Sequence, residues 1–525
     1  MAILIQSVKA PVGADENTVF EAALKKAGIR SAAVMKIHKT SLDARKREDI
    51  HFVHTVYAEL ESAAAEQKLA KRFSFVTPVT EGSIEPVISD RKVKGRVVIA
   101  GFGPAGMFAG LVLAENGYKP LILERGQRIE DRVRAVEKFM GGGAFNERSN
   151  IQFGEGGAGT FSDGKLTTRI KDPLCRYVLE QFVRFGAPEE ILVKAKAHIG
   201  TDKLRNVVKA VRERIEELGG EVRFDTQLSD IVTRNGRVGQ AVFEGGETEC
   251  SALMLAVGHS ARDTFEMLCR KGVFLEPKPF SVGARIEHRQ AAVDASLYGE
   301  HAGDPLLPKG EYQLSWRDHE GRGVYTFCMC PGGYVVPAAS EQGGVVTNGM
   351  SEFARDGENA NSAVVVSVSP ADFGDKPLDG VDFARQIERR AFELSGGFKA
   401  CGTTVEGFLS GKPSLDTDLV PTYSLGLEAV EYRRLFPGVV TGMLETGLSQ
   451  FSKKLACFGD GKAILSAPET RTSSPVRITR TDKLHSLSLE NLYPAGEGAG
   501  YAGGIMSAAV DGIRCALKIM ASQAP

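Results

Sequence analysis

The chain has 525 residues, a formal net charge of −1 and eight cysteines. This length suffices for about three domains, while the near-neutral charge gives no reason to expect nucleic acid or a membrane surface as a partner, and the cysteines are too few for a disulfide scaffold. Because no signal-peptide pattern opens the chain and no apolar run approaches the roughly 20 residues of a transmembrane helix, we expect a cytoplasmic protein.

Residues 1–90 predict a separate small α+β module in which helices and strands alternate. This interleaving is typical of a ferredoxin-like fold. The predicted strands are Ala2–Val8, Ser31–Lys39 and Ile50–Leu60, and the predicted helices are Glu16–Ala27, ending at Gly28, and Glu61–Arg72.

Basic residues cluster around the turn between the second and third of these strands. They are Lys36, Lys39, Arg45, Lys46 and Arg47. They could form an RNA-binding edge, but a solvated hairpin is the favoured interpretation, because Asp43, Glu48 and Asp49 dilute the charge and no stacking aromatics alternate with it.

The stretch Arg96–Glu124 predicts a dinucleotide-binding βαβ unit. An apolar strand is followed at once by Gly101-x-Gly103-x-x-Gly106, then by an apolar helix, a second strand and Glu124. Gly101 allows the tight turn, Gly103 lets backbone approach a pyrophosphate, and Gly106 lets the helix pack closely on the strand. Pro104 suits the first helical turn, whose N–H groups and positive dipole end favour phosphate. Glu124 is placed to accept hydrogen bonds from a ribose diol, and its charge disfavours NADP.

Two further GxGxxG matches have a different sequence context. Gly154, Gly156 and Gly159 have no apolar strand before them, so we expect a glycine-rich loop against a cofactor; a P-loop match over Gly159–Lys165 fails because Leu166 replaces the required Ser or Thr. The match at Gly498, Gly500 and Gly503 precedes the last helix, which is expected to complete the first site.

The pattern of predicted secondary structure changes near residue 266. Before it, short strands follow a helix at Thr201–Leu218, with a hairpin turn at Asn235-Gly236. After residue 266, antiparallel strands are predicted. Near residue 480 the earlier pattern of short strands, glycines and helix begins again. We therefore predict an α/β protein with a Rossmann-like parallel-sheet domain (95–265 and 480–525) and an inserted, mostly antiparallel α+β domain (266–479). The N-terminal ferredoxin-like module precedes both.

Together the motifs resemble a known family. They are GFGPAGMFAG at Gly101–Gly110 with Glu124-Arg125-Gly126, FGEGGAGTFSDGKL at Phe153–Leu166, AVGHSARDTF at Ala256–Phe265, FCMCPGG at Phe327–Gly333, ETRTSSPVRITR at Glu469–Arg480 and YPAGEGAGYAGGIMSAAVDG at Tyr493–Gly512. The chain resembles the glutathione-reductase-like superfamily of FAD-dependent oxidoreductases. It is most similar to the bacterial group known as uncharacterised FAD-dependent dehydrogenases.

The resemblance implies FAD as cofactor and a set of contacts to it. Leu228 would offer its backbone to the adenine, and Gly496-Glu497 stands where the superfamily has Gly-Asp for the ribityl and phosphate groups. The helix start at Gly503–Ile505 would face the pyrimidine end of the flavin. The full set of predicted contacts is Gly101, Gly103, Pro104, Ala105, Gly106, Glu124, Arg125, Gly156, Gly157, Ala158, Ser162, Lys165, Leu228, Gly258, Gly496, Glu497, Ala502, Gly503, Gly504 and Ile505.

Four residues are candidates for catalysis. Cys328 and Cys330 could form a strained, redox-active disulfide; two reduced cysteines with a structural role are the favoured alternative. Arg471 could grip a carboxylate and His288 could move a proton, with ion-paired structural arginines as the alternative, favoured for Arg285.

We therefore expect an FAD-dependent oxidoreductase that transfers hydride between flavin N5 and a small organic substrate held between the FAD and inserted domains. NAD(P)H as donor would bind without a dedicated domain, and no metal or membrane partner is expected. The alternative is a flavoprotein that binds or modifies RNA through residues 1–90.

Overall fold

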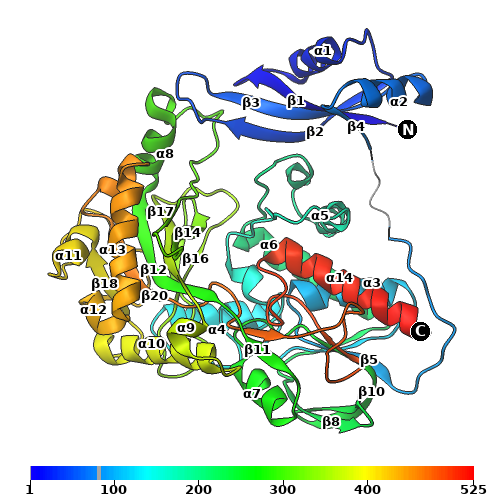
Figure 1. Ribbon diagram of the computed structural model, residues 1–525, viewed down its shortest axis with the longest axis vertical. Coiled ribbons are helices and arrows are strands. Elements are labelled where there is room, and N and C mark those ends of the chain that lie inside the picture. The colour runs from blue at the N-terminus through cyan, green and yellow to red at the C-terminus, as the bar shows by residue number, and fades with distance from the viewer. Residues whose placement is uncertain (1, 80–83) are drawn as a thin grey trace.

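A computed structural model of the protein describes residues 2–79 and 84–525. One four-stranded and two seven-stranded sheets organise these residues (Figure 1). Parallel and antiparallel pairing both occur, which confirms the predicted mixed α/β class.

The N-terminal module is a four-stranded antiparallel sheet with two helices. Its elements are β1 (Ile3–Pro11), α1 (Glu16–Ala27), β2 (Val34–Asp43), β3 (His51–Glu59), α2 (Ala63–Arg72) and β4 (Val76–Pro78), with strand order β2-β3-β1-β4. The Asp15 side chain caps α1 by accepting from Thr18 N, and Gly28 ends the helix at φ 66°. Ile3, Ile5 and Val56 are among the residues of the module's own core.

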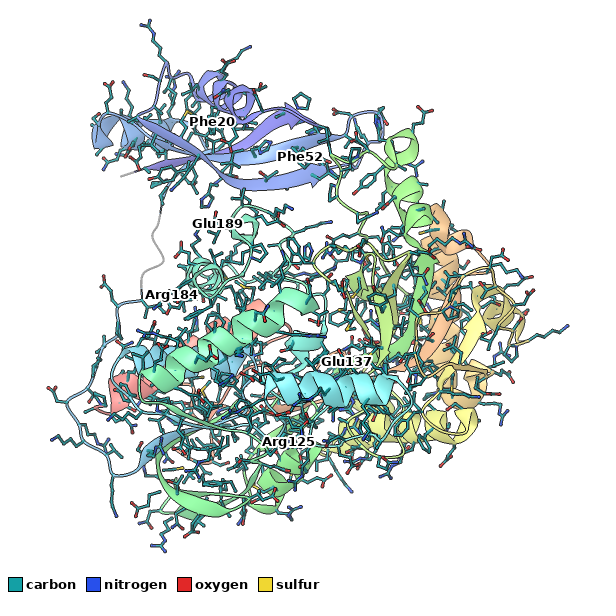
Figure 2. The ribbon with its side chains drawn as sticks, turned by 180° about the vertical axis from the view of Figure 1, so that it is seen from behind. Phe20, Phe52, Arg125, Glu137, Arg184 and Glu189 are labelled. Atoms are coloured by element: carbon teal, nitrogen blue, oxygen red, sulfur yellow. The ribbon has the colours of Figure 1, made fainter. Side chains whose placement is uncertain are left out.

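The module rests on the rest of the chain through one edge of β2. Thr40 N donates to Val193 O, and Ala195 N donates to Thr40 O, both at 2.8 Å. A third contact joins Arg47 Nη2 to Ser296 O at 2.6 Å. The module, with Phe20 and Phe52, thus lies over the segment that contains Glu189 (Figure 2).

The first seven-stranded sheet holds the predicted dinucleotide unit. Its strands are β5 (Arg96–Ala100), β6 (Leu121–Leu123), β7 (Glu221–Arg223), β8 (Leu228–Arg234), β9 (Arg237–Phe243), β10 (Gly246–Leu255) and β22 (Leu492–Pro494). The order is β7-β6-β5-β10-β9-β8, and β22 pairs with β10. β5, β6, β7, β10 and β22 pair in parallel, whereas the β8–β9–β10 meander is antiparallel.

Helices cover this sheet on both sides. They are α3 (Pro104–Glu115), α4 (Ile129–Met140), η1 (Ala158–Phe161), α5 (Leu174–Arg184), η2 (Glu189–Leu192), α6 (Thr201–Glu217), α7 (Arg262–Arg270) and α14 (Ile505–Ser522). Successive strand residues point to opposite faces. Val97 and Ile99 therefore pack with α3, α6 and α14, while Val98 and Ala100 pack with α7.

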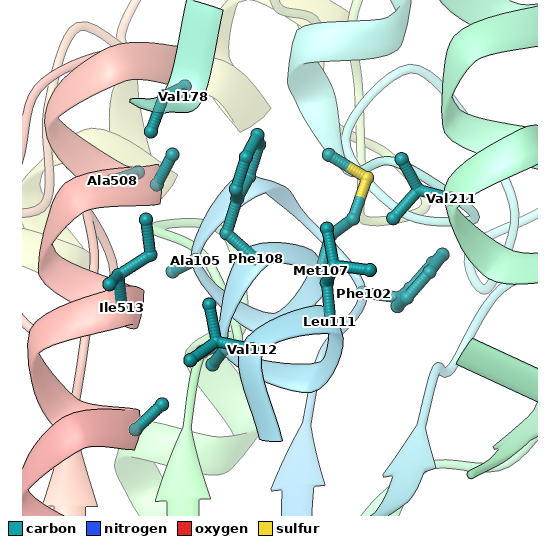
Figure 3. Packing of buried hydrophobic residues seen from close by; sticks show 14 of the residues in the cluster. Phe102, Ala105, Met107, Phe108, Leu111, Val112, Val178, Val211, Ala508 and Ile513 are labelled. Carbon is teal, nitrogen blue, oxygen red and sulfur yellow. The ribbon is translucent and has the colours of Figure 1, made fainter. Parts of the chain in front are cut away.

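α3 lies in the centre of this packing (Figure 3). Every residue from Ala105 to Ala114 is buried. Two glycines allow its close contacts: a Cβ on Gly106 would lie 2.0 Å from Gly101 O, and one on Gly512 of α14 would lie 2.1 Å from Ala105 O. The two helices that bound the predicted site are thus locked against each other.

The second seven-stranded sheet comes from residues between the two parts of the first. Its strands are β12 (Phe280–Arg289), β13 (Ser315–Arg317), β14 (Gly323–Cys330), β17 (Asn359–Val368), β18 (Ala400–Thr404), β19 (Leu427–Ala429) and β20 (Ile464–Glu469). The order is β13-β14-β17-β12-β20-β18-β19, and only β18 and β19 pair in parallel.

Short strand pairs and further helices complete this region. The pairs are β11 (Leu275–Pro277) with β21 (Val476–Ile478), and β15 (Tyr334–Pro337) with β16 (Thr347–Met350); the helices are α8 (Gln290–Tyr298), η3 (Gly299–His301), α9 (Pro370–Phe373), α10 (Asp379–Ser395), α11 (Val405–Ser410), α12 (Tyr432–Leu435), α13 (Gly438–Ser452) and η4 (Ala456–Gly459). β14 and β15 are consecutive in the chain but belong to different sheets, because Gly332 turns the chain between them at φ 49°. Within the described ranges, no helix is long and apolar enough to cross a bilayer.

Candidate functional site

A cavity of about 520 Å³ lies where the carboxyl ends of β5, β6 and β10 face the second seven-stranded sheet. Ligands of open parallel sheets bind at this edge. Most of the predicted cofactor residues line it: Gly101, Gly103, Pro104, Ala105, Glu124, Arg125, Gly157, Ala158, Ser162, Lys165, Leu228, Gly258, Gly496, Glu497, Gly503, Gly504 and Ile505.

Three predicted contacts do not line the cavity. Gly106 packs α3 against Gly101, and a Cβ on Gly156 would lie 2.1 Å from Thr160 Oγ1, so both glycines serve close backbone packing. Ala502 precedes the lining residues Gly503–Ile505 without being one of them.

One end of the cavity is formed by the N-terminus of α3 and by Glu124. Gly103 precedes the helix without a side-chain cap, and Pro104 occupies its first turn. The Glu124 carboxylate accepts from the backbone N–H groups of Phe102, Gly126 and Gly154, at 2.9–3.0 Å. A carboxylate has about four acceptor sites, so one remains for a ligand. Glu124 therefore also ties three segments of the cavity wall together.

The glycine-rich loop of residues 150–157 is held by Arg132, which the sequence reasoning missed. Arg132 extends from α4, is fully buried, and donates to the carbonyl oxygens of Asn150, Ile151, Glu155 and Gly157. The available signal was its position on the buried helix face that also carries Ile129, Val136 and Phe139.

The N-terminus of α14 also lines the cavity, and Gly159 lies between its Ile505 and Pro104 of α3. Gly504 precedes this helix without a side-chain cap, and the position of its Cβ, like that of Gly503, is open space. Glu497 lines the same region, where burial raises the pKa of its carboxyl to about 7 against the opposing effect of Lys278. This carboxyl changes protonation near neutral pH.

Cys328 lines the cavity, and Cys330 lies behind it. Both are free thiols. Cys328 has φ 45° at a bulge where the β14–β17 register shifts, and Arg285 Nη1 donates to its carbonyl at 2.9 Å. Cys330 Sγ donates to the carbonyl oxygen of Cys328 at 3.4 Å. A hydrogen bond from Cys330, aided by Arg285 and Lys165 against burial, lowers the pKa of the Cys328 thiol. The two cysteines therefore interact directly at the cavity wall.

The two arginines considered in the sequence differ in their exposure to the cavity. Arg285 is fully buried and makes a bidentate ion pair with Glu469, as its favoured structural interpretation predicts. Arg471 lines the cavity and makes a bidentate pair with Glu388 through Nε and Nη2.

His288, the proposed proton carrier, does not line the cavity. It lies on the face of β12 that carries Ala284 and Ile286 into the core, and its ring packs against Phe458 at a centroid distance of 4.9 Å. Alternate strand residues face opposite sides, so His288 and Arg285 cannot share a face. Neither ring nitrogen has a hydrogen-bond partner among the described residues.

Other cavity residues escaped the sequence reasoning. His259 follows β10, and burial, with Arg471 and Arg262, lowers its pKa to about 3, so its ring is neutral. Glu311 pairs with Lys165 at 3.0 Å. This ion pair joins a predicted cofactor residue to the segment between β12 and β13 of the second seven-stranded sheet. Single histidines and glutamates in loops carry no periodic pattern that would have identified them.

The chain is similar to a family model, to a full-length relative and to several solved structures. A family described as FAD-dependent protein, C-terminal domain-like, matches residues 279–472. An uncharacterized protein of Clostridium beijerinckii (strain ATCC 51743 / NCIMB 8052) is 45% identical over 529 residues, covering 99% of each chain. Solved structures with some similarity to the chain include glycine oxidase from Bacillus cereus ATCC 14579 (11% identity, TM-score 0.34, 82% of this chain and 98% of that one) and halogenase PltM (11%, 0.37, 82% and 67%).

Proposed function

The chain belongs to the same family as the Clostridium beijerinckii relative, and on that premise we propose that it is an FAD-dependent oxidoreductase acting on a small organic substrate. The family model that matches residues 279–472 is described as FAD-dependent, which supports FAD as the cofactor. The glutathione-reductase-like resemblance of its motifs supports placing it in that superfamily.

The residues around the cavity fit FAD. The observation that carries this is the pair of long helices, α3 and α14, whose uncapped N-termini line one cavity. Such N-termini bind anionic groups, and glycines at both keep side chains out of the way. Gly103 and Ala105 would hold the pyrophosphate, and Glu124 the adenosine ribose. Gly503–Ile505 would face the flavin ring.

When bound, FAD supplies a two-electron centre that exchanges hydride with an organic substrate. The chain's own residues orient the reactants and handle protons. The second seven-stranded sheet contributes Cys328 to the cavity wall, and β16 contributes Asn348. Glu497, whose carboxyl pKa is about 7, can hold or release a proton inside it.

A reduced nicotinamide is the proposed electron donor. It would bind without a dinucleotide fold of its own, because the second seven-stranded sheet is antiparallel except for β18–β19. We do not carry the RNA-binding alternative further: Arg45 of the basic hairpin is paired with Asp43.

The test is anaerobic. The purified protein is reduced with NADH, NADPH or dithionite, and candidate substrates are screened for reoxidation of the flavin absorbance. We expect at least one organic oxidant to restore the oxidised spectrum faster than buffer does. A flavin that no reductant or metabolite affects would indicate a protein that binds FAD without catalysis.

A further inference from the structure

One guanidinium at the cavity wall has unused donors. Arg471 exposes only 4% of its side chain and directs Nε and Nη2 to Glu388, at 2.9 and 3.0 Å. Its Nη1 has no hydrogen-bond partner among the described residues, although Arg471 lines the cavity. Buried donors are costly to leave unpaired. Nη1 is therefore a buried donor that lies beside the cavity, unpaired among the described residues.

Glu388 cannot satisfy this remaining donor group. Its two oxygens already accept from Arg262 twice, from Arg471 twice and from Thr470 Oγ1 at 2.6 Å. Those five hydrogen bonds exceed the roughly four acceptor sites of a carboxylate. One negative charge is thus shared between two guanidinium groups.

The other groups near Arg471 do not neutralise it either. His259 is uncharged, and Glu469 makes a bidentate pair with Arg285. Glu341 pairs with Arg262 and Arg385 rather than with Arg471. Burial, followed by repulsion from Arg262, lowers the pKa of Arg471, which marks a cation without full compensation.

We infer that Arg471 binds an oxyanion of the cavity's ligand through Nη1. The oxyanion is the carboxylate of the substrate or a phosphate of the dinucleotide. A guanidinium fits both, because its planar fork donates to two partners at once. The inference rests on the proposed function, since it names the group by which a substrate or cofactor is held.

Two substitutions of opposite expected effect test the inference. Arg471→Lys keeps the charge and a contact to Glu388 but lacks the second branch, so it should weaken oxyanion binding by about 10-fold or more. Glu388→Gln removes the shared counter-charge and should tighten binding. Arg385→Gln is the matched control: it breaks an ion pair of the same network outside the cavity and should leave binding unchanged.

The probes separate the two sources of the oxyanion. Calorimetric titration of the full-length holoprotein with benzoate, at constant ionic strength, reports a carboxylate site. The rate of FAD release on dilution, followed by flavin fluorescence, reports a phosphate site. Weaker benzoate binding in Arg471→Lys with unchanged FAD release assigns a substrate carboxylate, and the reverse assigns the dinucleotide phosphate.

Two results would overturn the inference. If Arg471→Lys leaves both measurements unchanged, Nη1 contacts only water. If Glu388→Gln weakens binding as much as Arg471→Lys does, the Arg471–Glu388 ion pair only stabilises the cavity wall and Arg471 does not bind the oxyanion. Thermal unfolding of each variant identifies a folding defect, and Arg471→Gln then serves as a second test. A protein purified without flavin would refute the proposed function instead, while the benzoate titration would still report on Arg471.

Discussion

Replacing His288 by phenylalanine should stabilise the second seven-stranded sheet. The ring is fully buried among aromatic neighbours, with both nitrogens unpartnered in the described structure. Each such group costs about 1–3 kcal/mol, so two cost about 2–6 kcal/mol. The larger phenyl ring costs about 1–3 kcal/mol in packing. Taking the middle of each range, the expected net gain for His288→Phe is about 2 kcal/mol.

The same burial predicts a dependence on pH. Burial lowers the pKa of His288 from 6.5 to about 4, because the charged ring cannot be solvated. The contribution of the neutral His288 ring to the free energy of unfolding is thus complete above pH 6.5 and is lost as the pH falls toward 4. The full difference between these two pKa values corresponds to about 3 kcal/mol of unfolding free energy. His288→Phe should lack this loss.

Urea unfolding followed by tryptophan fluorescence measures both effects. Trp316 is the single tryptophan and lies in β13 of the same sheet. The urea midpoint of the parent should fall between pH 7.5 and pH 5 by more than that of His288→Phe. His319→Phe, at an exposed histidine, is the control and should behave as the parent. If His288→Phe folds stably but loses substrate turnover, His288 acts in the chemistry and this reasoning is refuted.

Three further substitutions and one truncation test the cavity residues and the helices and domains that position them. Glu124→Ala removes the acceptor of three backbone N–H groups, so FAD release should accelerate by about 10-fold or more; release at the parent rate would count against the predicted ribose site. Cys330→Ala removes the hydrogen bond that lowers the pKa of Cys328, so iodoacetamide should alkylate Cys328 more slowly at pH 6; equal rates would contradict the pairing. Gly512→Ala puts a Cβ 2.1 Å from a carbonyl oxygen of α3, so the melting temperature and FAD content should fall together, whereas parent-like stability would mean that the helices can separate freely. A chain that starts at Lys92 should fold and bind FAD because the N-terminal module has its own core; a colourless aggregate would show that the two cores depend on each other.

Local signals in the sequence were sufficient for the βαβ unit and for the ends of several helices. The glycines before α3, the acid after β6 and the apolar strands are all adjacent in sequence. Likewise, Gly28 ends α1 at the predicted residue, and Asn235-Gly236 forms its predicted turn with both φ angles positive.

Elements buried on both faces were not predictable in this way. β17 is almost wholly buried and shows no alternation, so it carries no period-two pattern. β12 has the same character, and none of its residues, His288 included, lines the cavity. For such strands the sequence does not indicate which side is the core.

Functional contacts between distant segments were equally hidden. The Arg471–Glu388 pair spans 83 residues, and the Arg285–Glu469 pair spans 184. Each forms only when two regions of the chain fold against each other, so neither residue's neighbours in sequence reveal its partner. The motifs therefore predicted many of the residues that line the cavity but not the ion pairs around them.

The most direct test of the central claim is the identity of the flavin in the purified protein. The protein is denatured, and the released cofactor is identified by its chromatographic retention and mass. We predict FAD, in a ratio near one per chain, because Glu124 and the N-terminus of α3 serve an adenosine ribose and a pyrophosphate. FMN, or a protein without flavin after expression in flavin-replete cells, would contradict the account.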